Sequence, residues 1–531
     1  MLRGGAAAWR RPLSVAAPEL KAGAGRISFG QLGLPLHVYD KLSSNVKFPS
    51  MVQIAATPVI LRGADAVIQT SPGSGKTLAY LLPLIAGLDR RIALPQAVVI
   101  APSRELVYQL RGVAVGLLSG GSKQARAHPL RVEVAVGNIS DERIESLIEQ
   151  PPQLIFGTPL AATRLLGRLN RGRVRSVVLD EADALLSNAS LRSIISGGLL
   201  DRDGPVGVPR DAQIVTASAI MSDHVIAMIK QHMKRDIAGH VGAAVVTNGV
   251  LDRLERALAD AEKTQDLTVL PPAEIRRLAE AHVITVGDLE AEHRMRANIP
   301  SSLAPSIEHL ILLVEGKSPR PPAKTTTTDA DAESPSEPAA DGTDAAPAPT
   351  EIVLSTPAKE HAKAPSPVAM AAAFSRWFAV ARPQCVLVFC RDRLSAAHAS
   401  QLLQDKGFDA PVIHNAVSAE TRVRILRNIA CRRLRVVITT DLLGLGIDLP
   451  ALSHIFNWDA PAEWEQYVHR AGRVGRLDTL ARRHGVVVTP VARGSRELET
   501  MERVIGRLGV KAKTVSVKSG AMTEQPPFGR A

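Results

Sequence analysis

The chain has 531 residues, more than one ordinary domain needs, so two or three domains are expected. Apolar residues make up 45% and charged residues 22%, which allows sizeable cores and excludes a fully disordered chain. The formal net charge of +12 favours a polyanionic partner such as nucleic acid. Three cysteines cannot form a disulfide framework, and no apolar run is long enough to span a bilayer. A secreted disulfide scaffold and a membrane-spanning protein are therefore excluded.

Residues 1–25 are predicted to be a targeting presequence. The stretch from Met1 to Lys21 is rich in Ala, Gly and Arg, and its first acid is Glu19. Arg-rich, acid-poor segments that can form amphipathic helices are typical of organellar presequences. Because Ser and Thr are scarce and Arg residues come early, we favour the mitochondrion over the plastid. The alternative interpretation is a disordered basic tail.

Two stretches alternate short apolar strands with helical patterns, which is typical of parallel α/β domains. They cover residues 29–248 and 371–498. The expected strands are Ala66–Gln69, Ala97–Ala101, Gln153–Phe156, Ser176–Leu179 and Gln213–Thr216 in the first stretch, and Cys385–Phe389, Pro411–His414, Arg435–Thr439, Ser453–Asn457 and Gly485–Thr489 in the second. Cys385 and Cys390 are expected to be reduced core thiols that face opposite ways.

The remaining segments differ in composition. Residues 318–370 are predicted to be a disordered linker, because they contain eight Asp/Glu, four Lys/Arg and ten Pro. Leu251, Leu254 and Leu258 recur at helical spacing, so residues 249–300 are predicted to be a helical insertion, either a partner-docking device or a solvated surface hairpin. Residues 301–317 are assigned to the end of the first domain. Residues 499–531 are assigned to a basic tail that either adds salt-sensitive affinity for a polyanion or is merely solvated.

The strongest motif is Thr70-Ser71-Pro72-Gly73-Ser74-Gly75-Lys76-Thr77, which lies between an expected strand and a helical run. In such loops the glycines let backbone N–H groups close around phosphates. Lys76 would pair with the β- and γ-phosphate oxygens, and the Thr77 hydroxyl would ligate Mg²⁺. The motif therefore predicts a nucleoside triphosphate site.

Two further motifs complete the chemistry of that site. Asp180-Glu181-Ala182-Asp183 follows a buried strand, so Asp180 would hold Mg²⁺ through water and Glu181 would orient and deprotonate the attacking water. The array His469-Arg470-Ala471-Gly472-Arg473-Val474-Gly475-Arg476 lies in the second stretch. By default it is a surface for any anion, but its arginines could act on the γ-phosphate if the two domains close.

Together these motifs resemble the DEAD-box family of superfamily-two RNA helicases, which is named after the tetrad at 180–183. The resemblance extends from Phe29 to about Thr489. It implies an α/β fold of two RecA-like parallel-sheet domains in tandem, joined by the acidic linker. Residues 29–248 would be the helicase ATP-binding domain and residues 371–498 the helicase C-terminal domain. ATP and Mg²⁺ are the implied cofactors. RNA, gripped through its backbone, is the implied partner, and no membrane is involved.

The resemblance also implies individual roles. Phe29 would stack on adenine and Gln53 would bond to its edge. Ser218 would couple hydrolysis to strand separation, together with Asp183 and His469. The implied catalytic residues are Lys76, Asp180, Glu181, Arg473 and Arg476. The implied ATP-binding residues are Phe29, Gln53, Ser71, Gly73, Ser74, Gly75, Lys76, Thr77, Gly446 and Asp448. The implied RNA-binding residues are Pro102, Arg104, Gly137, Thr158, Arg393 and Thr440.

The sequence departs from the family pattern where RNA is gripped and the lobes are coupled. Ile220 replaces the Thr that ends the coupling motif, which removes a hydroxyl that could bridge Asp183 and His469. Leu445 replaces an Arg that helps to bind RNA and lock the lobes. The hydrolytic residues are unchanged. We therefore expect ATP binding and some hydrolysis with weak strand separation.

Two functions are compatible with these motifs and departures. The leading one is an organellar ATP-dependent RNA helicase that rearranges short duplexes or RNA–protein contacts, with ribosome assembly or RNA processing as its setting and ribosomal or other ribonucleoprotein intermediates as partners. The alternative is a catalytically weak RNA-binding assembly scaffold. A DNA helicase is a weaker third interpretation, because the adenine-reading motif and the tetrad are of the RNA type.

Overall fold

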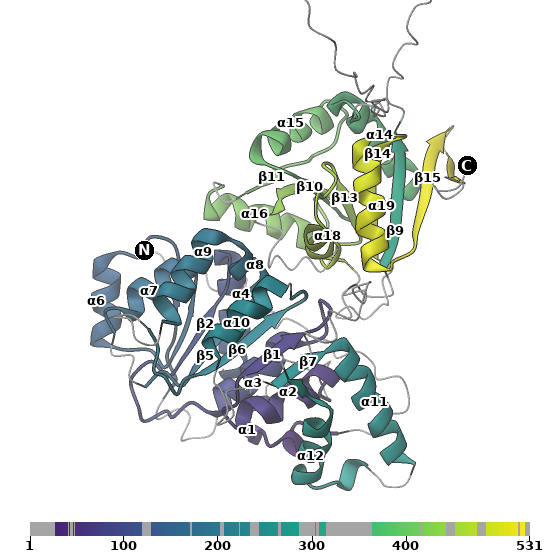
Figure 1. The fold of residues 1–531 in the computed structure, drawn as a ribbon. Helices are drawn as coiled ribbons and strands as arrows, with labels where there is room; N and C mark the ends of the chain where they lie inside the picture. The colour runs from purple at the N-terminus through teal and green to yellow at the C-terminus, as the bar shows by residue number, and fades with distance from the viewer. Residues whose placement is uncertain are drawn as a thin grey trace, which may run out of the picture.

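The computed structural model describes residues 27–40, 42, 46, 48–118, 129–169, 173–201, 207–221, 223–233, 244–263, 267–285, 303, 307–314, 364–414, 417–441, 452–474, 485–518 and 521–525. They form two α/β lobes, one around each of two eight-stranded sheets (Figure 1). The predicted fold of two parallel-sheet domains in tandem is confirmed.

The first sheet has the strand order β3-β4-β2-β5-β6-β1-β7-β8, and neighbouring strands run parallel except β7 and β8. Its strands are β1 (Ala66–Gln69), β2 (Ala97–Ile100), β3 (Val132–Ala135), β4 (Leu154–Gly157), β5 (Ser176–Asp180), β6 (Gln213–Ser218), β7 (Ala244–Thr247) and β8 (Ile284–Thr285). The five predicted strands are present, β1 with the predicted bounds and the other four with shifts of one or two residues at their ends, whereas β3, β7 and β8 were not predicted.

Helices cover both faces of this sheet, which is why its central strands are almost wholly apolar. The helical segments of the first lobe are η1 (Gly30–Leu32), α1 (Leu36–Tyr39), α2 (Met51–Leu61), α3 (Lys76–Ala86), α4 (Arg104–Leu118), α6 (Asp141–Glu149), α7 (Pro159–Leu166), α8 (Ala182–Ser187), α9 (Ala189–Ile194), η2 (Ile195–Leu199), α10 (Asp223–His232), α11 (Asn248–Glu262), η3 (Leu267–Val269) and α12 (Pro272–His282). Their apolar faces build one core cluster on each side of the sheet.

The second sheet has the order β11-β12-β10-β13-β14-β9-β15-β16, and β16 alone among its described strands runs antiparallel to its neighbour. Its strands are β9 (Ile307–Val314), β10 (Val386–Cys390), β11 (Val412–Ile413), β12 (Val436–Thr440), β13 (His454–Asn457), β14 (Gly485–Ala492), β15 (Ala512–Lys518) and β16 (Ala521–Gln525). Its helices are α14 (Pro367–Ala381), α15 (Arg393–Gln404), α16 (Ala419–Ala430), α18 (Trp464–Ala471) and α19 (Arg496–Leu508).

Strand β9 corrects two sequence predictions. The sequence places residues 301–317 in the first domain, but β9 pairs with β14 over its whole length and also with β15, inside the second sheet (Figure 1). Leu310, Leu312 and Val314 pack in one cluster with Phe374 and Trp377 of α14. The acidic segment between β9 and α14 therefore joins two elements of the second lobe, not the two lobes. The assignment followed sequence order and was wrong, because β9 precedes the acidic segment but belongs to the domain that follows this segment.

The predicted basic tail and the predicted insertion also have a place in the fold. The described residues of 499–531 include the rest of α19 and the strands β15 and β16, which extend the second sheet to its edge. The helices expected in 249–300 are present as α11 and α12. Leu254, Leu258 and Ile275 are 0% exposed in a cluster shared with α2, which excludes the solvated hairpin.

The cysteine and membrane predictions can be compared directly with the structure. Cys385 and Cys390 are buried free thiols in two different core clusters, as expected for side chains that face opposite ways. Burial raises the pKa of Cys385 to about 11, which keeps the thiol protonated at neutral pH. Within the described part of the chain, every helix is too short or too polar to cross a bilayer.

Candidate functional site

The phosphate loop joins β1 to α3, as the sequence predicted. Gly73 and Gly75 have φ angles of 77° and 99°, in the left-handed region that glycine adopts without steric cost. The ammonium group of Lys76 donates to the backbone carbonyls of Thr70, at 2.6 Å, and Ser71, at 3.0 Å. The hydroxyls of Thr70 and Ser74 lie 2.8 Å apart. Lys76 is thus held over the loop at the start of α3, where helix geometry favours phosphate.

Gln53 contacts this loop from α2. Its Oε1 accepts from the backbone N–H of Ser50 at 2.9 Å, and its Nε2 donates to the carbonyl of Gly75 at 3.2 Å. A Cβ atom at Gly75 would lie only 2.6 Å from Gln53 Nε2, so the close approach requires glycine. Gln53 therefore supports the loop. Phe29, in contrast, is 2% exposed and its ring stacks on Tyr39 at 5.8 Å. Phe29 therefore packs on Tyr39 in this structure, and its contact with adenine stays a prediction.

The acidic tetrad begins where β5 ends. The Tyr80 hydroxyl, from α3, donates to Asp180 Oδ2 at 2.8 Å, and Thr77 lies at the start of the same helix. Burial, followed by the charge of Glu181, raises the pKa of Asp180 to about 7, although Tyr80 and Lys76 act in the opposite direction. Hydroxyl and carboxylate oxygens are the ligands that Mg²⁺ prefers. Thr77 and Asp180 therefore fit the predicted metal.

Glu181 has a φ of 51°, unusual for a residue other than glycine. Such strained backbone persists where surrounding structure holds it, and it is frequent at functional sites. The turn separates Asp180, at the end of the strand, from Asp183, in α8. Each carboxylate of the tetrad consequently has a different set of neighbours.

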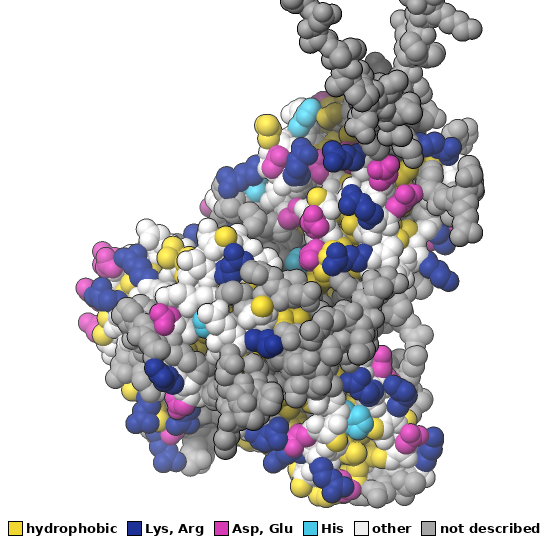
Figure 2. All heavy atoms as spheres, in the orientation of Figure 1, with side chains coloured by type: hydrophobic (Ala, Val, Ile, Leu, Met, Phe, Trp, Pro, Cys, Tyr) yellow, Lys and Arg dark blue, Asp and Glu magenta, His cyan; other side chains and the backbone are white. Residues whose placement is uncertain are grey.

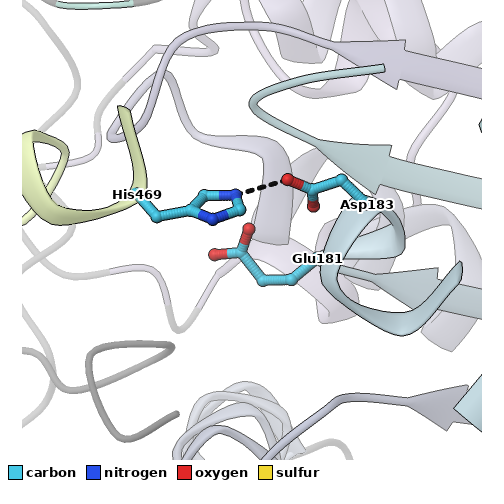
Figure 3. Close-up of side chains that lie close together, drawn as sticks. All are labelled: Glu181, Asp183 and His469. Carbon is cyan, nitrogen blue, oxygen red and sulfur yellow. Dashed lines mark hydrogen bonds and ion pairs between the residues drawn. The ribbon is translucent and has the colours of Figure 1, made fainter. Parts of the chain in front are cut away.

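Asp183 links the two lobes (Figure 3). Its Oδ1 accepts from the Ser218 hydroxyl at 2.5 Å, and its Oδ2 pairs with Nε2 of His469, on α18 of the second lobe. Burial alone would raise the pKa of Asp183, but His469 and Ser218 together lower it. Burial alone would lower the pKa of His469, but Asp183 raises it. The predicted coupling residues therefore meet as an ion pair, without the Thr hydroxyl that Ile220 replaces.

Arg473 brings a positive charge from the second lobe to the acidic tetrad. One of its terminal nitrogens lies 3.7 Å from Glu181 Oε1, and its Nε donates to the carbonyl of His469 at 3.2 Å. The side chain of Arg470, also predicted in this array, is buried and makes a bidentate contact with Asp441, so it holds α18 in place. Arg476, Gly446 and Asp448 lie outside the described residues.

The second lobe also touches the phosphate loop itself. A Cβ atom at Gly472 would lie 2.6 Å from Cγ and 3.1 Å from Cβ of Pro72. The φ of Gly472 is −66°, which alanine adopts readily, so the glycine is needed for the close approach and not for backbone freedom.

We therefore expect Gly472→Ala to lower RNA-stimulated ATP hydrolysis at least about ten-fold while the melting temperature stays nearly constant, because the new methyl group separates the lobes without disturbing either core. Gly506→Ala is the matched control, since a Cβ there has no heavy atom within 4 Å. Equal activities of the two variants would contradict the contact. Adding Pro72→Ala, which removes the Cγ atom, should restore part of the loss.

A second interlobe ion pair lies away from the nucleotide loop. Arg422 of α16 pairs with Glu105 of α4, and its guanidinium also donates to the carbonyls of His414, at 3.2 Å, and Val417, at 3.0 Å. The interlobe role of Glu105 is not predicted from the sequence, because a single sequence does not indicate which lobe surfaces meet.

The predicted RNA-binding residues gather at the carboxyl ends of strands in each lobe. Pro102 and Arg104 follow β2, Gly137 follows β3, and Thr158 follows β4. A Cβ at Gly137, whose φ is 66°, would lie 2.4 Å from the Arg104 guanidinium, so these two residues are in contact. In the second lobe Arg393 follows β10 and Thr440 ends β12, and these strands pair.

Charges of both signs lie on the same face of the molecule (Figure 2). Figure 2 shows lysine and arginine side chains on both lobes, interspersed with acidic side chains on the same face. The formal net charge of +12 would add salt-dependent attraction to any bound nucleic acid.

The phosphate loop and acidic tetrad of the first lobe meet Arg473 of the second lobe, so two parallel-sheet lobes form one candidate nucleotide site. This arrangement is typical of helicase-type nucleoside triphosphatases. The DEAD/DEAH box helicase family model matches residues 50–229, and the model of the helicase conserved C-terminal domain matches residues 370–478. The chain belongs to the DEAD-box family of ATP-dependent RNA helicases.

Individual relatives agree with this assignment. The ATP-dependent RNA helicase CshA of Limosilactobacillus reuteri is 23% identical over 488 residues, which cover 90% of this chain and 72% of that protein. The DEAD-box ATP-dependent RNA helicase CshB of Bacillus subtilis is 22% identical over 430 residues, which cover 81% and 71%.

Solved structures share the fold. Dbp5 of S. cerevisiae bound to RNA and ADP BeF3 superposes with a TM-score of 0.63 at 19% identity, covering 92% of this chain and 96% of that one. Mss116p bound to single-stranded RNA and AMP-PNP gives a TM-score of 0.59 at 15% identity, covering 89% and 75%.

Proposed function

We propose that this chain hydrolyses ATP, with Mg²⁺, when RNA holds its lobes together, and that it uses the cycle to rearrange short RNA duplexes or RNA–protein contacts. The observation that best supports the proposal is the placement of Arg473. It extends from α18 of the second lobe to within 3.7 Å of Glu181 in the first lobe. Lobe closure and hydrolysis therefore depend on the same residue.

Each residue of the site has a separate task in this proposal. Lys76 exchanges its carbonyl partners for the β- and γ-phosphate oxygens when ATP enters the loop. Glu181 accepts a proton from the attacking water and aligns it with the γ-phosphate. Arg473 then moves from Glu181 to the γ-phosphate oxygens, whose charge grows during transfer. Thr77 and Asp180 would hold Mg²⁺, which neutralises the phosphate charge when bound.

RNA would lie across the strand ends of both lobes. The backbone-binding set includes Arg104 and Thr158 in the first lobe and Arg393 and Thr440 in the second. Contacts to phosphates and 2′-hydroxyls fix position without reading sequence. Because aromatic residues make up only 3% of the chain, stacking of bases on aromatic side chains is a minor contribution.

The decisive experiment is ATP hydrolysis by the full chain with and without single-stranded RNA, beside Glu181→Gln. We expect RNA to stimulate turnover and the substitution to lower kcat at least about 100-fold with ATP affinity retained, because the amide cannot accept the proton. Asp405→Asn, a conservative change of an exposed acid, is the control. If the unsubstituted chain binds ATP but hydrolyses it no faster than Glu181→Gln, the proposed enzymatic function is wrong. That result would indicate a nucleotide-gated RNA scaffold.

Strand separation requires its own assay. The Leu445 and Ile220 departures lead us to propose that the chain separates short duplexes slowly relative to its ATP turnover. A labelled short RNA duplex measured beside the ATPase assay gives the ratio of the two rates. Efficient separation at every turnover would contradict the proposal of weak unwinding while leaving the helicase assignment intact.

The cellular setting is a further proposal that rests on composition alone. The Arg-rich, acid-poor stretch up to Lys21 supports import into an organelle, with the mitochondrion favoured over the plastid. Assembly of the organellar ribosome or RNA processing is the proposed process. Imaging of the tagged full chain, compared with Arg3→Glu/Arg10→Glu/Arg11→Glu, tests the address. Unchanged location of the triple variant would contradict it.

A further inference from the structure

The coupling motif at the end of β6 makes an apolar contact with the second lobe. Ala219 and Ile220 are 4% and 1% exposed. Among the described residues of the first lobe, they alone belong to the hydrophobic cluster formed by the second lobe. That cluster includes Val468 and Ala471 of α18, the helix that leads to Arg473. We call this the interlobe apolar contact.

The polar side of the motif is already complete without a hydroxyl at position 220. Ser218 donates to Asp183, His469 pairs with the other oxygen of Asp183, and the backbone N–H of Ile220 donates to Ser218 Oγ at 3.2 Å. The side chain of Ile220 is therefore available for packing alone. A threonine there would bring a buried hydroxyl into an apolar cluster, which costs free energy unless it finds a partner.

We propose that Ile220 is a positioning residue, and that its apolar side chain seats α18 and Arg473 against the phosphate loop. Burial of the isoleucine stabilises the closed arrangement of the lobes, in which Gly472 meets Pro72 and Arg473 meets Glu181. In this chain the coupling between the lobes thus has an apolar contribution beside the Asp183–His469 ion pair. The inference rests on the proposed ATPase function, because Arg473 acts in hydrolysis.

The sharpest test compares Ile220→Val with Ile220→Thr, because the two side chains have nearly the same shape and differ by a hydroxyl. We expect Val to retain RNA-stimulated kcat within about three-fold, and Thr to lower it at least about ten-fold. Ile220→Ala should resemble Thr. A Thr variant as active as Val, or more active, would overturn the proposal, since the hydroxyl would then be the working group.

A matched control and a second measurement distinguish the positioning role of Ile220 from a merely structural one. Ile214 lies on β6, the strand that leads to Ile220, is 1% exposed, and belongs to a core cluster of the first lobe. Ile214→Ala should lower the melting temperature by several degrees without selectively lowering RNA stimulation. Ile220→Ala should selectively lower RNA stimulation and change the melting temperature less than Ile214→Ala does. Energy transfer between dyes on the two lobes should also decrease in Ile220→Ala at saturating RNA and a non-hydrolysable ATP analogue.

The two failures are distinguishable. If Glu181→Gln leaves turnover unchanged, the proposed enzyme function fails, but the order of Val and Thr in lobe closure still tests the contact. If Glu181→Gln abolishes turnover and Ile220→Ala leaves both closure and RNA-stimulated kcat unchanged, only the positioning role of Ile220 is wrong.

Discussion

Replacement of Arg473 with alanine is expected to lower kcat for RNA-stimulated ATP hydrolysis about 1,000-fold or more, with the KM for ATP nearly unchanged. The guanidinium lies 3.7 Å from Glu181, and the residue is 7% exposed, so water cannot easily substitute for it. Its charge is needed mainly when the γ-phosphate becomes more negative in the transition state. Loss of such an interaction lowers kcat more than it weakens binding of the ground state.

Two variants make this expectation specific. Arg473→Lys keeps a charge but loses the planar donors, and should recover only a small part of the activity. Arg503→Ala removes an exposed arginine of α19 that donates to Thr500, and should leave kcat unchanged. The measurement is steady-state hydrolysis at saturating RNA. A loss of less than about ten-fold in Arg473→Ala would contradict the assigned role.

The motifs and central strands could be predicted because their causes are local. A phosphate loop needs glycines and a lysine between a strand and a helix, and Lys76 at the start of α3 meets that requirement. Buried parallel strands are continuous apolar runs, so β1, β2 and β5 could be located within one residue. Strands at or next to the edge of a sheet, such as β3 and β15, alternate polar and apolar residues and gave no such signal.

Long-range arrangement explains what the sequence did not indicate. The residues around β9 do not indicate that this strand, which precedes the acidic segment, belongs to the second sheet, because its pairing partners lie more than 150 residues later. The same limit applies to the site. Tyr80 contacts Asp180 across 100 residues, and Arg422 meets Glu105 across the lobes. The sequence also does not indicate that the ring of Phe29 stacks on the ring of Tyr39, because that contact depends on how the chain turns between the two residues.

Asp180→Asn is expected to stabilise the first lobe and to abolish hydrolysis at the same time. The pKa of Asp180 is raised from 3.8 to about 7, mainly by burial. Between these two pH values the folded protein holds a proton that the unfolded chain has released. Stability therefore falls as pH rises through this range, and the whole penalty is present above pH 7. Asparagine is never charged, and its one side-chain oxygen can still accept from Tyr80, although the backbone N–H of Glu181, which donates to Asp180 Oδ1 at 3.1 Å, then loses that acceptor.

The gain in the free energy of unfolding should accordingly grow with pH, from about 1–2 kcal/mol at pH 5 to at most ~4 kcal/mol at pH 8.5. Calorimetry of the full chain in EDTA, without nucleotide, at both pH values measures it. Asp405→Asn, at an exposed helix end, should change stability by less than about 0.5 kcal/mol at either pH. A pH-independent gain, or a loss, would mean that Asp180 is not held in a costly environment. If the stability gain appears while kcat falls at least about 100-fold, the carboxylate of Asp180 costs the fold stability but is needed for hydrolysis. Such a trade-off is expected of a residue that would hold the metal.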